Sequence, residues 1–241
     1  MMPAMISFVL PIYNCYDEFR EYFPYFSNWL QIRGISFEII IIDDHSDDRQ
    51  DISNLVDAPG ITYLYNEKNF GKGYSVKKGF MTAKGSWLVF MDGDFPFDLT
   101  VIDKIENIAK AGDADMIIGD RTQKDSSYPV DLSFLRKQGS RVLSAVASRF
   151  FTADIYDTQC GIKGFRKSVA TDLFGQLTQN RFSFDLEILF LATRKKLRIE
   201  RVPVTVRQQK SSSVRILRDG FITIASLFSI YLNRISGKYK I

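Results

Sequence analysis

The sequence predicts an α/β protein in which a mostly parallel sheet is covered by helices on both faces. Three observations predict this fold: short, nearly uninterrupted apolar segments of strand length, helical segments between them, and acidic pairs directly after two of the strands. Strands of a parallel sheet are buried on both faces and therefore read as continuous apolar runs. The 241 residues, 45% hydrophobic and 25% charged, suit one globular domain, or one domain with an appendage.

Strand and helix signals alternate through the first half of the chain. The segment 37–42 is a mostly β-branched run of strand length, whereas 18–32 has apolar residues at near-helical spacing. The same criteria predict strands at 6–10, 37–42, 62–65, 87–91 and 115–119, and helices at 18–32, 73–83 and 99–111. The second half is less regular, and we expect a loop at 123–131, helices at 135–151 and 181–195, and a strand at 199–206.

Composition and charge exclude several classes of protein. The 32 Lys and Arg residues against 28 Asp and Glu residues leave a net charge of +4, too balanced for a protein that coats nucleic acid. Cys15 and Cys160 cannot form a disulfide framework or a Cys-rich zinc site. His45, the single histidine, excludes a His-pair metal site and argues against a Ser-His-Asp hydrolase.

The sequence also predicts where the protein works. The N-terminus lacks the basic start and long apolar region of a signal peptide. The longest mostly apolar run, 221–232, is shorter than the roughly 20 residues that span a bilayer. We therefore expect an intracellular protein that does not cross a membrane by itself.

Acidic pairs follow two of the most apolar strands, at the place where ligands bind in doubly wound sheets. Asp92 and Asp94 stand one residue apart and can hold a hard cation, Mg²⁺ or Mn²⁺, that bridges the phosphates of a nucleotide. A plain turn remains the alternative for this Asp-Gly-Asp sequence. Asp44 can accept hydrogen bonds from a base or ribose, whereas Ser46 or Asp47 can cap a following helix. His45 is assigned no catalytic role.

Two further segments carry candidate chemistry. Lys72 lies between two glycines at the start of a predicted helix, a place where the backbone can approach a phosphate, although the spacing is not that of a Walker motif. Asp185 and Glu187 are separated by roughly 200° on a helix, so they cannot share one face. One of them is therefore expected to point to a site while the other is solvated or capping.

The C-terminal part combines basic residues with an apolar helix. Residues 194–218 contain nine basic residues and one acid, Glu200, an excess of 9 − 1 = 8 positive charges that suits either a solvated face or an anionic lipid surface. The helix predicted at 219–233 has one narrow polar stripe, formed by Thr223, Ser226, Ser229 and Asn233. So wide an apolar face needs a bilayer interface, a partner helix or a deep core.

Taken in their order along the chain, these motifs resemble the family-2 glycosyltransferases of the GT-A fold, which have a Rossmann-like sheet. The first-half motifs stand at 9–14, 42–46, 69–73 and 92–94. Those of the second half resemble the dolichyl-phosphate glucosyltransferase and mannosyltransferase branch, and they stand at 119–121, 136–140, 157–161 and 184–187. The sequence Asp157-Thr158-Gln159-Cys160-Gly161 is most similar to the glucosyl members.

The resemblance implies inverting transfer of a sugar, glucose, from a UDP-linked nucleotide-sugar to a polyprenyl or dolichyl phosphate. Arg121 and Arg136 would then face phosphates of donor or acceptor, and Asp157 would lie near the reacting carbon. The acceptor phosphate is anionic at pH 7 and needs no strong general base. The nucleoside would be held by Pro11, Tyr13 and Asp44 with Lys72 nearby, and ribose, metal and diphosphate by Asp92 and Asp94.

The resemblance further implies a GT-A domain over 1–218 and a C-terminal apolar helix over 219–241. That helix would dock on the cytoplasmic face of a membrane or on a separate membrane protein, and a homo-oligomer is left open. Three positions depart from the family pattern: Cys15 replaces an acidic residue, Pro96 replaces a metal-binding Gln, with Asp98 as the substitute, and Ser213 replaces a Lys.

Three alternative functions compete with this interpretation. A family-2 enzyme that glycosylates a saccharide hydroxyl would need a general base, for which Asp157 or Asp185 would serve. A nucleotidyltransferase would need a Gly-rich basic loop after the first strand, where 11–14 has none. A binding module without turnover would account for the departures at Cys15, Pro96 and Ser213.

Overall fold

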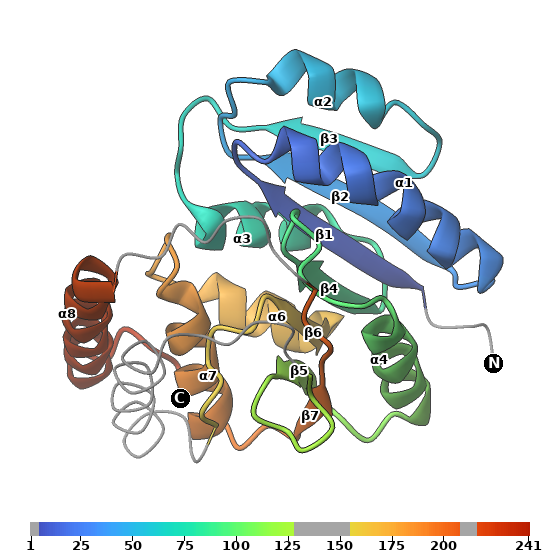
Figure 1. The fold of residues 1–241 in the computed structure, drawn as a ribbon. Coiled ribbons are helices and arrows are strands. Elements are labelled where there is room, and N and C mark those ends of the chain that lie inside the picture. Colours follow the sequence, from blue (N-terminus) through green and yellow to red (C-terminus); the bar gives the residue numbers. More distant parts are fainter. Residues whose placement is uncertain (1–4, 128–154, 208–215) are drawn as a thin grey trace.

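A central sheet organises the part of the chain that this computed structural model describes, residues 5–127, 155–207 and 216–241, with the backbone alone over 216–224. Its strands are β1 (Ile6–Ile12), β2 (Phe37–Asp43), β3 (Ile61–Tyr65), β4 (Trp87–Met91), β5 (Met116–Asp120), β6 (Ile162–Arg166) and β7 (Ile199–Pro203). They lie in the order β3-β2-β1-β4-β6-β5-β7 (Figure 1). Strand β6 runs antiparallel to both neighbours, and the other pairs are parallel.

Helices cover both faces of this sheet. On one face, α1, α2 and α4 pack against strand residues such as Phe8 and Leu10, and on the other face α3, α6, α7 and α8 pack against residues such as Val9. Successive side chains of a strand point to opposite faces, so the apolar strands supply both cores. The described helices are α1 (Tyr16–Ile32), α2 (Arg49–Leu55), α3 (Lys72–Thr82), α4 (Thr100–Ala111), α6 (Lys167–Gly175), α7 (Phe184–Arg194) and α8 (Ile216–Ile235). The predicted α/β fold with a mostly parallel, doubly covered sheet is confirmed.

The predicted elements of the first half begin and end within two residues of the observed ones. Two elements of the second half were missed, β6 and α6, and so was the short helix α2. The strand predicted at 199–206 ends at Pro203, and the helix predicted at 181–195 begins at Phe184. The helix predicted at 135–151 lies outside the described residues.

The C-terminal helix packs on the sheet domain. Leu227 and Ile230 of α8 join the apolar cluster on the α7 side of the sheet, and so does Tyr239 beyond the helix. Figure 1 places α8 at the outer edge of this layer. No helix in the described ranges is long and apolar enough to cross a bilayer. The division of the chain at 218/219 stays a prediction.

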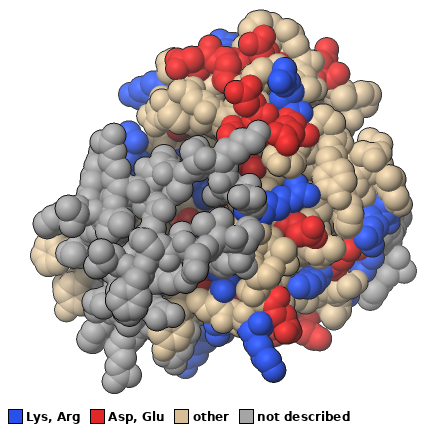
Figure 2. Space-filling view, viewed as in Figure 1, with Lys and Arg blue, Asp and Glu red and all other residues tan. Residues whose placement is uncertain are grey.

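Most basic residues of the run at 194–218 whose side chains are described have partners within the fold, and the contact of this run with lipid stays a prediction. Arg198 binds Asp115, Arg201 binds Asp120 and Lys195 binds Asp172. The guanidinium of Arg207 lies over the rings of Tyr22 and Tyr25 on α1. Lys210 and Arg215 lie outside the described residues. Figure 2 shows Asp and Glu side chains gathered at the upper end of one face, with both signs interspersed below.

Candidate functional site

The carboxyl ends of β1, β2 and β4 lie next to one another along one edge of the sheet. The strand order reverses between β1 and β4, and ligands of open α/β sheets bind in the crevice at such a point. A Cβ atom on Gly93 would lie 2.3 Å from Ile12 Cγ2 and 3.2 Å from the Pro11 carbonyl oxygen. Glycine is therefore required for the turn after β4 to pack on the end of β1, and this packing brings Pro11 beside the turn at 92–94.

Backbone strain is concentrated at this edge. Asn14, His45 and Phe95 all have positive φ angles, of 47°, 74° and 48°, and each lies shortly after the end of β1, β2 or β4. Residues other than glycine rarely adopt this conformation, and a bulky residue such as Phe pays most for it. Such outliers collect at functional sites, where the surrounding structure holds them in place.

The first acidic pair shapes the site from within the protein. Asp43 accepts hydrogen bonds from Ser46 N at 2.8 Å and from the Tyr63 hydroxyl at 2.6 Å. The buried carboxylate of Asp44 accepts hydrogen bonds from Asn66 Nδ2 at 2.8 Å and from two backbone N–H groups, Phe70 N at 3.0 Å and Gly71 N at 2.7 Å. Asp44 thus fixes the turn that carries Lys72, and its proposed contact with a nucleoside stays a prediction.

The alternative that Ser46 or Asp47 caps a helix is wrong. Ser46 Oγ accepts a hydrogen bond from Asn14 N at 3.0 Å, and Asp47 Oδ2 accepts one from Asn14 Nδ2 at 3.1 Å. Helix α2 begins after Asp48, whose side chain makes no capping hydrogen bond. Both side chains therefore bind Asn14, 32 residues before Ser46, instead of the start of a helix. These bonds connect the loop after β1 to the loop after β2.

Lys72 is the first residue of α3 and points at the second acidic pair. Its Nζ atom lies 2.6 Å from Asp92 Oδ1 and over the rings of Phe90 and Phe184, at 5.4 and 5.8 Å from their centroids. Burial alone would lower the pKa of Lys72, but Asp92 and then Asp185 raise it above its ordinary value. Lys72 is therefore a cation at neutral pH and offsets part of the negative charge of the carboxylates.

The glycines on either side of Lys72 let another segment approach closely. Gly71 has a φ of +100°, and a Cβ atom there would lie 2.6 Å from the Asn180 carbonyl oxygen. A Cβ atom on Gly73 would lie 2.7 Å from Phe184 Cβ. The segment from 179 to 184 thus seats directly on this turn, which is a packing reason for two glycines that the sequence analysis attributed to phosphate binding.

Asp92 and Asp94 form a donor set that fits a divalent cation. Burial, and next the charge of Asp92, raises the pKa of Asp94 to about 7, so the pair is short of positive charge. Segment 157–161 closes on it, since a Cβ atom on Gly161 would lie 2.1 Å from Asp92 Oδ2. Mg²⁺ and Mn²⁺ sites often use one or two carboxylates and complete the shell with water and substrate phosphates.

No third protein ligand joins this pair in the described ranges, where no cluster of three His, Cys, Asp or Glu side chains is arranged to hold a metal. Asp98, the substitute suggested for the missing Gln, binds Thr100 N at 3.0 Å and Thr100 Oγ1 at 2.7 Å at the start of α4. The carboxylate of Asp98 is therefore already bound to Thr100, the first residue of α4. The remaining metal ligands would come from the donor phosphates and water.

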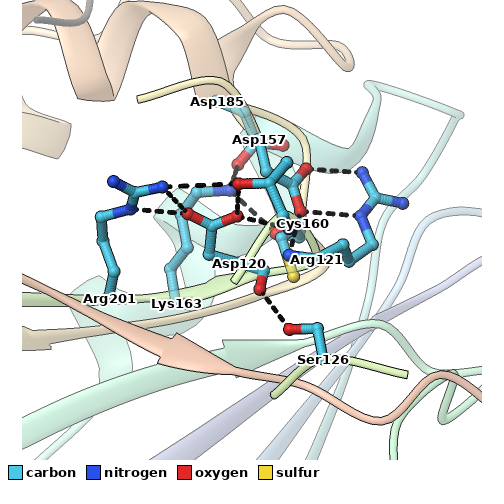
Figure 3. A network of polar contacts seen from close by, with 9 residues as sticks. Asp120, Arg121, Ser126, Asp157, Cys160, Lys163, Asp185 and Arg201 are labelled. Carbon is cyan, nitrogen blue, oxygen red and sulfur yellow. Dashed lines mark hydrogen bonds and ion pairs between the residues drawn. The ribbon is translucent and has the colours of Figure 1, made fainter. Parts of the chain in front are cut away.

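A second polar cluster lies at the end of β5 (Figure 3). Arg121 holds Asp157 with a two-pronged ion pair, Nε to Oδ2 at 2.8 Å and Nη2 to Oδ1 at 2.7 Å, and its backbone N–H donates to the same carboxylate at 2.7 Å. Next to it, Arg201 Nε donates to Asp120 Oδ2 at 2.6 Å. Both carboxylates are buried, while the Arg121 side chain is 34% exposed. Asp157 therefore sets the direction of the Arg121 guanidinium.

The third cluster is a fully buried ion pair. Lys163 of β6 donates to Asp185 Oδ1 at 2.5 Å and to the Cys160 carbonyl oxygen at 2.9 Å. Burial raises the pKa of Asp185, and the charges of Lys163 and Lys72 oppose that rise. Asp185 is thus shared between two lysines, one of which also binds Asp92. The charges alternate along the row Asp92, Lys72, Asp185 and Lys163.

The expectation that either Asp185 or Glu187 is solvated or caps a helix is wrong, because both are buried. Glu187 accepts hydrogen bonds from the backbone N–H groups of Thr178 and Gln179 and from the Tyr239 hydroxyl. The two carboxylates do point to different sides of α7, as the helical angle predicted. Each finds its partners in a different segment of the chain.

The structure thus groups most of the predicted site residues. Asp92, Asp94, Lys72 and Asp185 form one charged row, and Arg121 and Asp157 form a bound pair in the adjoining segment. Tyr13 lies at the end of β1 with about half of its side chain exposed. Arg136 lies outside the described residues. Lys163 was missed, because its partner Asp185 lies 22 residues further along the chain.

The fold and the site first define a class of protein, α/β proteins that bind a ligand at the carboxyl ends of a doubly wound sheet. A family model described as "Glycosyl transferase family 2" matches residues 7–174, and the chain belongs to this family. It is therefore a glycosyltransferase. The family resemblance stated from the sequence is confirmed.

Curated relatives and a solved structure agree with this assignment. The chain is 26% identical over 251 residues to dolichyl-phosphate beta-glucosyltransferase ALG5D of Trichomonas vaginalis, covering 98% of this chain and 74% of the relative. It is 28% identical over 215 residues to dolichyl-phosphate beta-glucosyltransferase of Dictyostelium discoideum, covering 86% and 66%.

The solved structure is glucosyl-3-phosphoglycerate synthase from Mycobacterium tuberculosis in complex with Mn²⁺, UDP and glucosyl-3-phosphoglycerate. It superposes with a TM-score of 0.68 at 18% identity, covering 94% of this chain and 80% of that chain. This similarity shows that the two proteins share the GT-A fold.

Proposed function

We propose that this protein transfers glucose from a UDP-linked donor to a polyprenyl phosphate, with inversion at the anomeric carbon. The names of its dolichyl-phosphate beta-glucosyltransferase relatives support the sugar and the class of acceptor. The acceptor phosphate oxygen forms a bond to the anomeric carbon while the bond from that carbon to the donor diphosphate breaks. The nucleoside diphosphate then leaves with the bonding electron pair.

One observation carries the choice of acceptor: Asp157 and Asp185 are each held in an ion pair with a basic residue of the protein. A hydroxyl acceptor needs a general base, and these two carboxylates were the candidates for it. Asp157 is held by three hydrogen bonds from Arg121, and Asp185 is buried against Lys163. A phosphate acceptor is already an anion at neutral pH and needs no such base. The alternative of a saccharide hydroxyl acceptor is therefore disfavoured.

The protein's own side chains have distinct tasks in this proposal. Pro11 and Tyr13 border the nucleoside, and Asp44 holds the turn that carries Lys72 beside the donor diphosphate. Arg121, directed by Asp157, faces a phosphate, which a guanidinium binds with two parallel hydrogen bonds. Arg136 is assigned the same kind of contact. Electrostatic groups fixed in advance stabilise developing charge without reorganisation at the moment of reaction.

Asp92 and Asp94 would hold a divalent cation, Mg²⁺ or Mn²⁺. When bound, such an ion acts as a Lewis acid that stabilises the leaving diphosphate. The structure of the Mycobacterium tuberculosis synthase contains Mn²⁺ together with UDP. The two acidic side chains and the raised pKa of Asp94 support a cation at the corresponding place here.

We further propose that the protein works at the cytoplasmic side of a membrane. Cys15 and Cys160 are both free thiols in the structure, which suits a reducing compartment. Separation of a cell lysate into soluble, peripheral-membrane and integral-membrane fractions tests this. Release of the protein from membranes by high salt or carbonate is expected, whereas recovery only with detergent would contradict it.

The test is a transfer assay with the purified chain, Mg²⁺ or Mn²⁺, a polyprenyl phosphate and a panel of labelled nucleotide-sugars. We expect label from UDP-glucose in the organic phase. Asp94→Asn should lower that transfer by at least 10²-fold, a loss of the order found when a group that stabilises transition-state charge is removed. Asp113→Asn, which changes an exposed carboxylate after α4, is the matched control and should leave the rate unchanged.

Four outcomes would contradict parts of the proposal. Label from a donor other than UDP-glucose would show that the transferred sugar is not glucose. Full activity of Asp94→Asn would show that Asp94 is not a metal ligand needed for turnover. Donor hydrolysis, or transfer to an oligosaccharide without lipid labelling, would favour the saccharide acceptor. Transfer undiminished by excess EDTA would show that turnover does not require a divalent cation.

A further inference from the structure

The polar stripe of α8 faces the protein rather than the solvent. Ser226 Oγ donates to Ser183 Oγ at 2.7 Å, and Asn233 Nδ2 donates to Thr178 Oγ1 at 3.1 Å. Between them, Ser229 Oγ accepts a hydrogen bond from Gln179 Nε2 at 3.3 Å. The three described members of the stripe therefore bind one segment, 178–183. The usual helix at a protein surface turns its polar side outward.

The outward side of α8 is apolar. Phe228, Tyr231, Leu232 and Ile235 are 63%, 48%, 48% and 66% exposed. At 100° per residue they fall within about 100° of the helix circumference, and we call these four side chains the outer face of α8. Side chains at three- and four-residue spacing lie next to one another on a helix, so the four form one continuous stripe. The helix thus turns its polar stripe and two buried apolar residues, Leu227 and Ile230, toward the protein and an apolar face outward.

The charges next to the outer face are of one sign. From Gly220 to Ile241 the sequence has three basic residues, Arg234, Lys238 and Lys240, and no Asp or Glu. All three are exposed. Apolar side chains with basic residues beside them are the combination that holds a helix in the headgroup region of a bilayer with anionic lipids.

A second copy of the chain fits this surface poorly. In a symmetric dimer the same patch lies on both partners, so each copy would bring basic residues to the interface and no acidic residue from 220–241 to balance them. A stable protein interface also buries about 800 Å² on each side, more than a stripe of four side chains supplies. A bilayer needs no such area from one helix and offers charge of the opposite sign.

We propose that the outer face of α8 docks in the interfacial region of an anionic bilayer. This deepens the proposed function, because it would hold a lipid acceptor near the donor site. Segment 178–183, which α8 binds on one side, contacts the Lys72 turn on the other, where Tyr74 N donates to the Asn180 carbonyl oxygen at 3.0 Å. The docked helix and the donor site are thus linked by one short segment. Vesicle binding itself requires neither donor nor turnover.

The test is flotation of the full chain with two kinds of vesicle. One is phosphatidylcholine alone, and the other contains roughly 30% phosphatidylglycerol, which gives it a negative surface potential. We expect binding to the anionic vesicles that weakens with salt. The double variant F228S/I235S should bind at least tenfold more weakly. Ile32→Ser, which changes an exposed isoleucine at the end of α1, is the matched control and should bind like the unchanged protein.

A second variant keeps the test independent of folding defects. Phe228→Trp retains an apolar ring and reports its surroundings. Its fluorescence should shift to shorter wavelength with anionic vesicles and be quenched by brominated lipid, whereas Ile32→Trp should show neither effect. Equal vesicle binding of F228S/I235S and the unchanged protein would overturn the proposal. The proposal would also be overturned if sedimentation showed a dimer of the unchanged protein that F228S/I235S does not form. The outer face of α8 would then be an interface between two copies of the chain.

The docking surface and the proposed function can fail separately. Vesicle binding without transfer in the assay above would keep the docking surface and remove the function. Transfer to a water-soluble, short-chain polyprenyl phosphate by a protein that binds no vesicle would keep the function and remove the docking surface.

Discussion

Lys72 Nζ and Asp92 Oδ1 lie 2.6 Å apart, and this contact joins the two motifs that form the candidate donor site. Lys72 comes from the first turn of α3, and Asp92 from the end of β4. The lysine lies between two aromatic rings, and its pKa is raised by Asp92 and Asp185 against the effect of burial. The charge at the end of β4 is therefore set by groups from three separate segments.

Replacing Lys72 should disable the site without unfolding the protein. Lys72→Met keeps an apolar stem between Phe90 and Phe184 but removes the cation beside Asp92. We expect kcat/KM for sugar transfer to fall by about 10²-fold, as when a fixed charge at a reacting diphosphate is lost. Lys77→Met, five residues further along α3, is the matched control. A comparable loss in both variants would contradict a specific role for Lys72.

The turn around Lys72 should tolerate no side chain at Gly71. Gly71→Ala places a methyl group 2.6 Å from the Asn180 carbonyl oxygen at a φ of +100°, and we expect it to lower the free energy of unfolding by ~1–3 kcal/mol. Gly175→Ala, at the end of α6, meets nothing within 4 Å and should change stability little or raise it by up to ~1 kcal/mol. Urea unfolding of both variants checks the opposite signs.

The buried pair of Lys163 and Asp185 should be costly to break on one side only. Lys163→Met leaves a buried carboxylate with one partner fewer, and we expect a loss of ~3–5 kcal/mol in the free energy of unfolding. The double variant K163M/D185L removes both charges and should recover part of that loss. A double-mutant cycle by chemical denaturation measures the coupling. Additive effects of the two substitutions would show that the pair contributes no coupling energy.

Alkaline pH should weaken the attachment of the C-terminal segment. Burial, and next the hydrogen bond to Glu187, raises the pKa of Tyr239 to about 12, against about 10 in an unfolded chain. The neutral hydroxyl is thus favoured by the fold, so its contribution is complete below pH 10 and is lost as pH rises toward 12. In the Tyr239→Phe variant the phenylalanine side chain has no hydroxyl group to ionise. The stability difference between the unchanged protein and Tyr239→Phe should therefore shrink over that window, and a constant difference would contradict the raised pKa.

Much of the fold follows from local sequence, and the exceptions have physical reasons. The segment 37–42 is recognisable because it contains four consecutive isoleucines, a β-branched run that suits a buried strand. Strand β6 was missed because Lys163, Gly164 and Arg166 interrupt its apolar pattern. The side chain of Lys163 is buried only because Asp185, 22 residues further along the chain, supplies the opposite charge. No local pattern contains that information.

The site shows the same division. The acidic pairs at the ends of β2 and β4 could be located from the sequence because parallel strands end at one edge. The partners of each carboxylate could not, since they come from distant segments. Ser46 was a candidate helix cap and instead binds Asn14, and the hold of Arg121 on Asp157 was not expected. The place of Asp157 beside the reacting carbon stays a prediction. The sequence also could not show which face of α8 is turned toward the protein, because its polar stripe binds a segment about 50 residues earlier.

The most direct test of the account compares a polyprenyl phosphate with the polyprenol of the same chain length as acceptors for labelled UDP-glucose. We predict that the phosphate is glycosylated and the alcohol is not, because Asp157 and Asp185 are both held in ion pairs and the acceptor must bring its own negative charge. Equal labelling of the alcohol would contradict it, since a general base would then have to act at the site.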